Sequence, residues 1–212
     1  MPELSFSCTD ARPEPYSASP SLQFLLRVTE ATGVRMHSVA LRCQVRIEPH
    51  RRRYSGNEAS RLVDLFGDTS RWGETLKPMQ LATIAVMVPS FAEEIEVPLT
   101  VPVTADLDVA TTKYFHGLDD GDIPLLLLFS GTAFYAGETG LQVELVPWHL
   151  EVNYPLPVEV WRATMAEHFP GSTWLRLRTE TLEALRSYRA DRGQVSWDDT
   201  FAELLKRAGE QP

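Results

Sequence analysis

The segment HSVALRCQVRIE, residues 37–48, decides the fold class. Its apolar side chains occupy every second position, which places them on one face of an extended strand: Val39, Leu41, Cys43, Val45 and Ile47. A strand with one solvated face is typical of an antiparallel sheet, because strands in parallel sheets are covered on both faces and form continuous apolar runs. The segment therefore predicts an antiparallel β region.

Neighbouring segments extend this prediction over residues 21–150. Residues 91–104 are expected to form an edge strand or a bulged strand, because Pro98 and Pro102 cannot donate a ladder hydrogen bond. The run Ile123–Phe129 lacks polar alternation and is expected at the buried centre of the region. Its strand is expected to form a hairpin with the preceding one. The full set of strands expected beside residues 37–48 is 22–29, 80–88, 91–104, 105–115, 123–135 and 141–146.

The two flanks of this β region have different compositions. Residues 1–20 hold Pro2, Pro13, Pro15 and Pro20 among Ser, Glu and Asp, which predicts a flexible Pro-rich arm. Within residues 151–212 the apolar spacing changes to three and four residues, which predicts helices. The expected fold class is therefore α+β, with an antiparallel β-sandwich-like region followed by C-terminal helices.

Residues 173–208 have a strand–helix–helix pattern that resembles the ribbon-helix-helix family. Trp174–Arg178 fits a short strand, and Thr179 and Ser196 fit the N-caps of two helices. In that family strands of two chains pair and expose side chains to DNA, so the resemblance implies DNA contacts by Arg176 and Arg178. The helices also carry many carboxylates, which would face phosphate. A helical hairpin that packs on the sheet or on a second copy is the alternative.

Charge and cysteine content exclude several function classes. With 20 Lys and Arg against 29 Asp and Glu, the formal net charge of -9 disfavours nucleic acid as a partner. Cys8 and Cys43 are too few for a disulfide framework or a Cys-rich metal site. The first twenty residues lack the pattern of a secretory signal, and no apolar run is long enough for a membrane span. We expect a cytoplasmic protein.

No segment carries a recognisable catalytic or cofactor-binding motif. The five histidines include no helical pair at zinc-ligand spacing, and Ser130-Gly131 lacks the upstream glycine of a nucleophile elbow. The acidic run Asp119–Asp122 has the composition of a tight turn. The sequence therefore predicts no cofactor, no metal site and no catalytic residue, and it favours a non-enzymatic protein.

Side chains near predicted strand ends are the remaining candidates for a binding site in the β region. They are Tyr114, His116 and Trp148, of which the tryptophan is the type of residue that anchors protein partners. An enzyme with a dispersed site is a further hypothesis, and it would combine Tyr114 and His116 with Asp106 and Asp108.

Several stretches together resemble an actinobacterial family of uncharacterised proteins. They are PVTADLDVATTKYF (102–115), DGDIPLLLLFSGTAFY (120–135), VPW (146–148) and residues 174–185. Genes of this family accompany those of actinobacterial-type NiFe-hydrogenases. The resemblance implies an accessory or assembly role with a protein partner, namely the hydrogenase or its maturation factors, and a homodimer stays open. It implies no catalytic residue.

Overall fold

A computed structural model describes residues 2–106, 109–138 and 140–210. The chain divides into two compact units, unit 1 (Met1–Trp174) and unit 2 (Leu175–Pro212). No helix among the described residues is long and apolar enough to cross a membrane.

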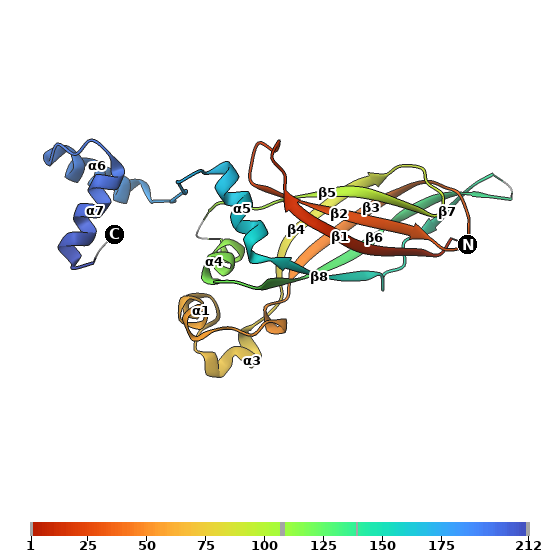
Figure 1. Ribbon diagram of the computed structural model, residues 1–212, viewed down its shortest axis with the longest axis horizontal. Coiled ribbons are helices and arrows are strands. Elements are labelled where there is room, and N and C mark those ends of the chain that lie inside the picture. Colours follow the sequence, from red (N-terminus) through yellow and green to blue (C-terminus); the bar gives the residue numbers. More distant parts are fainter. Residues whose placement is uncertain (1, 107–108, 139, 211–212) are drawn as a thin grey trace. The chain divides into compact units, whose positions relative to one another are not determined.

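The described residues of unit 1 form two antiparallel sheets (Figure 1). The first has three strands in the order β1 (Leu4–Pro13), β2 (Ser21–Glu30) and β5 (Glu94–Pro102). The second begins with β4 (Met79–Val88), β3 (Met36–Ile47) and β6 (Asp122–Gly137). The other edge of β6 pairs with β8 (Glu151–Pro157) along its first half and with β7 (Gly140–Leu145) along its second half. The predicted antiparallel β-sandwich-like region with C-terminal helices is confirmed.

The core lies between the two sheets. The five alternating side chains predicted to share one face of β3 are at most 2% exposed, which confirms the pattern of residues 37–48. Phe6 of the first sheet stacks on Phe129 of the second at 4.3 Å between ring centroids. Strand β6 is central, as predicted, but only alternate members of its apolar run are buried. Leu126 and Leu128 are half-buried on the outer side of the sheet.

The predicted flexible arm at residues 1–20 is wrong over Leu4–Pro13, which forms β1. This strand pairs antiparallel with β2 from Leu4 opposite Glu30 to Pro13 opposite Leu22. Its prolines are compatible with pairing because Pro2 precedes the strand and Pro13 is its last residue, where an edge strand tolerates the missing donor. Residues 1–20 therefore contribute an edge strand to the sandwich.

The predicted strand at residues 105–115, and with it the hairpin to β6, is also wrong. Helix α4 (Ala110–Gly117) occupies the C-terminal part of that segment. Thr111, Tyr114, Phe115 and Leu118 are buried at helical spacing, and this tertiary burial outweighs the β-branched composition. A Cβ at Gly117 would lie 2.5 Å from the Leu62 side chain, so the glycine permits the close approach of the chain there.

Helices close one end of the sandwich (Figure 1). Between β3 and β4 lie η1 (Pro49–Arg51), α1 (Gly56–Arg61), α2 (Val63–Phe66), η2 (Thr69–Arg71) and α3 (Trp72–Thr75). Helix α5 (Val158–His168) follows β8 and buries Trp161 against Phe115, with ring centroids 5.4 Å apart. The prediction that residues 151–212 are helical is wrong for β8, where Pro155 and Pro157 lie on an edge strand.

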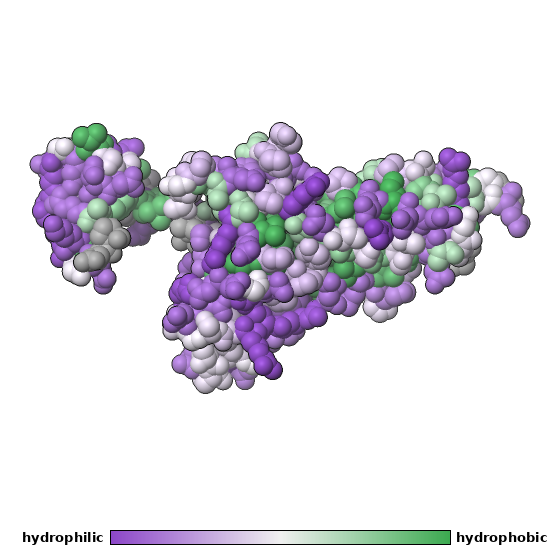
Figure 2. All heavy atoms as spheres, in the orientation of Figure 1, coloured by the Kyte–Doolittle hydropathy of each residue, from purple (hydrophilic) through white to green (hydrophobic). Residues whose placement is uncertain are grey.

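Unit 2 consists of α6 (Thr179–Asp191) and α7 (Trp197–Ala208), which confirms the two predicted helices. Ser196 caps α7, because its hydroxyl accepts a 3.0 Å hydrogen bond from the backbone amide of Asp199. Residues 173–178 form no strand within the single chain. Hydrophilic residues cover most of the surface shown in Figure 2, including that of unit 2.

Candidate protein-binding surface

Tyr114 and His116 do not form an open site in the described structure. The Tyr114 side chain is fully buried, and its hydroxyl lies 2.9 Å from the hydroxyl of Tyr54. Burial raises the pKa of Tyr114 far above its usual value, and it also raises that of Tyr54, to about 12. His116 lies edge-on to Trp161 at 4.8 Å. Burial and then Arg162 lower the pKa of His116. Asp108 lies outside the described residues.

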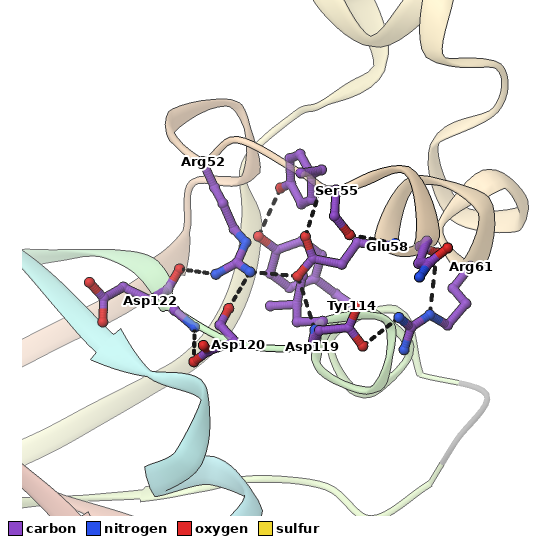
Figure 3. Close-up of polar contacts among 12 residues, drawn as sticks. Arg52, Ser55, Glu58, Arg61, Tyr114, Asp119, Asp120 and Asp122 are labelled. Carbon is purple, nitrogen blue, oxygen red and sulfur yellow. Dashed lines mark hydrogen bonds and ion pairs between the residues drawn. The ribbon is translucent and has the colours of Figure 1, made fainter.

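A buried ion pair fastens the turn before β6 to helix α1 (Figure 3). Arg52 donates a 2.6 Å hydrogen bond to the Glu58 carboxylate and a 2.6 Å hydrogen bond to the carbonyl of Asp122. The carboxylate also accepts from the backbone amides of Ser55 and Asp119, at 2.8 and 2.9 Å. The Arg52 and Glu58 side chains are 10% and 5% exposed. The pair therefore links the turn before β6 to helix α1 in the interior of the protein.

Hydrogen bonding determines the charge state of Glu58. Burial alone would raise the pKa of this carboxyl, but the backbone amides of Ser55 and Asp119 and the Arg52 guanidinium outweigh it, so the pKa lies below its usual value. The Asp119 carboxylate pairs with Arg61. The predicted turn at Asp119–Asp122 is thus held both through its backbone, by Glu58 and Arg52, and through the Asp119 side chain. In the part of the chain that is described, no three His, Cys, Asp or Glu side chains are placed to hold a metal ion.

Strand β7 exposes its apolar side to solvent. Leu141, Val143 and Leu145 are 61%, 59% and 74% exposed. The register with β6 places Val143 opposite the outward-facing Phe134 and Glu144 opposite Ala133, which is buried. One oxygen of the Glu144 carboxylate is buried and has no hydrogen-bond partner among the described residues. The polarity of β7 is therefore reversed relative to an ordinary sandwich strand, which buries its apolar side.

Trp148 extends this exposed apolar character into the segment between β7 and β8. Its side chain is 88% exposed, and His149 lies edge-on to it at 6.0 Å. Trp148, Leu128 and Arg42 line a shallow hollow of about 380 Å³ on the outer side of the five-stranded sheet. A second hollow of about 470 Å³ adjoins the first and shares Arg42 and Ser130 with it. Met87, which is 62% exposed, lines this second hollow.

We call this solvent-facing side of β4, β3, β6 and β7, together with Trp148, the outer face. The outer face carries positively charged side chains, although the chain as a whole is acidic. Arg42 is exposed at its centre, and Arg46, two residues further along β3, donates a 2.8 Å hydrogen bond to Gln44. Glu151 of β8 pairs with Leu128 in the ladder and lies at the margin. The outer face therefore combines exposed aliphatic and aromatic groups with two guanidinium groups.

The sequence-predicted binding residues fall in different places. Trp148 belongs to the outer face, whereas Tyr114 is buried and His116 packs on α5. Arg176 and Arg178 are exposed in unit 2, where Arg178 is the N-cap residue of α6 and neither lies on a strand. Sequence reasoning missed Leu141, Val143 and Leu145, because alternation in β7 shows that its two sides differ but not which side meets the core.

These features define an antiparallel β-sandwich protein with a C-terminal helical unit and a solvent-exposed apolar sheet face. The chain belongs to DUF6084, a family of unknown function, whose model matches residues 1–212. No curated protein matches the chain.

Two solved structures are weakly similar to the chain. β-Glucosidase 3B from Thermotoga neapolitana is 13% identical, with a TM-score of 0.27, over 73% of this chain and 17% of the glucosidase. A protein assigned as ApaA from Bordetella pertussis is 13% identical, with a TM-score of 0.25, over 73% of this chain and 93% of that protein. At these scores neither likeness supports a function.

Proposed function

We propose that this protein is a non-enzymatic binding protein that docks on another protein through the outer face. The main observation that supports this proposal is the reversed polarity of β7, whose apolar side faces solvent. Burying a large aliphatic side chain contributes roughly 1.5–3 kcal/mol, and β7 presents three such side chains to water. Contiguous exposed apolar groups of this kind are typical of interaction sites.

The chemistry of the outer face indicates the kind of partner surface. Trp148 offers a large apolar area with one donor group, which is common at the energetic centre of interfaces. Arg42 lies within the same hollow and would be stabilised by a carboxylate on the partner. The complementary surface is therefore apolar at its centre and carries at least one acidic side chain.

The resemblance to proteins encoded beside NiFe-hydrogenases supports a more specific proposal, in which the partner is a hydrogenase subunit or one of its maturation factors. An assembly protein needs an open apolar surface, because it holds a partner whose own apolar surface is still uncovered. The outer face meets this requirement without any cofactor.

Binding to purified hydrogenase subunits tests both levels of the proposal. The full-length protein and a Leu145→Ser/Trp148→Ser variant are compared by calorimetry or surface plasmon resonance. Both side chains are largely exposed, so the variant should keep its fold while its affinity falls by about thirtyfold or more. Tyr16→Ser is the matched control, because Tyr16 is 94% exposed and lies before β2, away from the outer face.

Two outcomes would contradict the proposal at different levels. Equal affinity of the double variant and the wild type would remove the outer face as the docking site. Absence of binding to every hydrogenase subunit and maturation factor, together with normal hydrogenase processing in a deletion strain, would remove the assembly role.

A further inference from the structure

Strand β4 differs from every other edge strand of the described sandwich. The other edges carry features that discourage pairing with a further strand. Prolines and glutamates have this effect in β5 (Pro98, Pro102, Glu94 and Glu96) and in β8 (Pro155, Pro157 and Glu151). Strand β1 has a bulge after Cys8 and carries the charged residues Asp10 and Arg12. Strand β7 is short and carries Glu144. The sequence of β4, MQLATIAVMV, contains neither a proline nor a charged residue.

The free edge of β4 is regular over most of its length. Its pairing with β3 has one irregularity near Gln80 and then runs without interruption from Ala82 to Val88. No strand in the described part of the chain pairs with its other edge. An unpaired edge of this kind can accept a further strand, as in β-strand addition.

The side chains of β4 are also incompletely covered on both sides. Ile84 and Val86 point toward the core but are only half-buried, whereas their β3 partners Cys43 and Leu41 are almost fully buried. On the outer side Ala85 is exposed and Met87 is 62% exposed. A strand added at this edge would cover apolar groups on both faces of the sheet.

We infer that two copies of this chain pair through β4, antiparallel about a two-fold axis, so that their five-stranded sheets join into one. Such pairing keeps core-facing residues opposite core-facing residues. In one allowed register Ile84 lies beside its own symmetry mate and the small Ala82 lies opposite the larger Val86. A strand without charges places no like charges across the axis, although each copy carries a net charge of -9.

A second copy fits this edge better than a foreign strand, because one symmetric contact covers two unprotected edges at once. The joined sheet would end on β7 and β8 in both directions, and these carry the pairing-discouraging residues. The outer faces of the two copies would become parts of one continuous surface. The inference concerns the edge of the sheet and is independent of the partner proposed for its face.

Sedimentation velocity of the full-length protein over a wide concentration range tests the inference. We expect a reversible dimer, and Thr83→Lys should weaken dimerisation by about tenfold or more by placing like charges near the axis. Thr83 is exposed on β4, so the lysine should not disturb the core. Thr100→Lys on β5 is the matched control and should leave the dimer unchanged, because that edge already carries prolines and glutamates.

Hydrogen exchange of the wild type keeps the inference testable if the variant fails to fold. Amides between Ala82 and Val88 should become more protected as protein concentration rises. A wild type that stays monomeric throughout, or a dimer whose β4 amides exchange at the same rate at every concentration, would overturn the inference. If the protein did not bind hydrogenase, the sedimentation and hydrogen-exchange results would be unaffected. The dimerisation inference and the proposed function can therefore be rejected independently of each other.

Discussion

Strands β2 and β7 have the same alternating pattern but opposite relations to the core. Leu22, Phe24, Leu26 and Val28 of β2 are 0% exposed, whereas the apolar residues of β7 are 59–74% exposed. Strand β2 lies in the middle of its sheet, and one side of it is buried along its whole length. Among the described residues, strand β7 pairs only with the last residues of β6, and it turns Gln142 and Glu144 inward. Alternation therefore defines two sides of a strand, and the tertiary structure decides which side is buried.

The matched substitutions Leu26→Ala and Leu145→Ala should separate these two roles most clearly. Leu26→Ala removes fully buried methyl groups and should lower the free energy of unfolding by about 3 kcal/mol, from lost burial and the cavity left behind. Leu145→Ala should change stability by less than about 0.5 kcal/mol, because its side chain already meets water. Urea denaturation followed by circular dichroism measures both. A loss above about 2 kcal/mol for Leu145→Ala would show that β7 buries this residue.

Two carboxylates with buried oxygens, those of Glu58 and Glu144, provide a polar version of the same comparison. Glu58 has an arginine and two backbone amides as partners, whereas one oxygen of Glu144 has none among the described residues. A buried charge is favourable only when its hydrogen bonds are satisfied. We therefore expect Glu58 to stabilise the fold and Glu144 to destabilise it.

Glu58→Gln should lower the free energy of unfolding at pH 7 by about 2 kcal/mol, because it removes the charge that pairs with the buried Arg52. The pKa of Glu58 is depressed in the folded protein, so the unfolded chain takes up the proton first as pH falls. The contribution of Glu58 should thus be complete above its usual pKa of 4.5 and decline below it. Denaturation of both proteins from pH 7 to pH 3 measures this, and a difference that stays constant over that range would contradict the assignment.

The sequence predicted the parts of the fold that depend on local periodicity. The alternation of residues 37–48 identified β3 and its buried face, and Pro98 and Pro102 identified β5 as an edge. Residues 4–13 and 110–117 were misassigned because tertiary contacts decide them. Pairing with β2 orders the first of these segments, and burial of Tyr114 and Phe115 makes the second helical.

Prediction of the candidate site was limited for the same reason, because tertiary contacts decide which side chains are exposed. Trp148 was identifiable from its residue type and its place between strands. Leu141, Val143 and Leu145 were assigned to a strand, but a one-residue change of register exchanges the two faces, and nothing local to LQVEL fixes that register. The Arg52–Glu58 pair joins residues whose roles depend on the turn at Asp119–Asp122, which lies far away in the sequence.

Glu144→Val gives the smallest expected effect and the most direct test of the inward orientation of β7. Valine replaces a carboxylate that has a buried oxygen without a partner, so stability should rise by about 1 kcal/mol. The matched change Glu138→Val, at an exposed position near the end of β6, should leave stability within about 0.5 kcal/mol. Thermal unfolding at pH 7 compares the two variants with the wild type. If Glu144→Val lowered stability while Leu145→Ser raised it, the polar side of β7 would be the one that meets water, and the outer face would lose its apolar character.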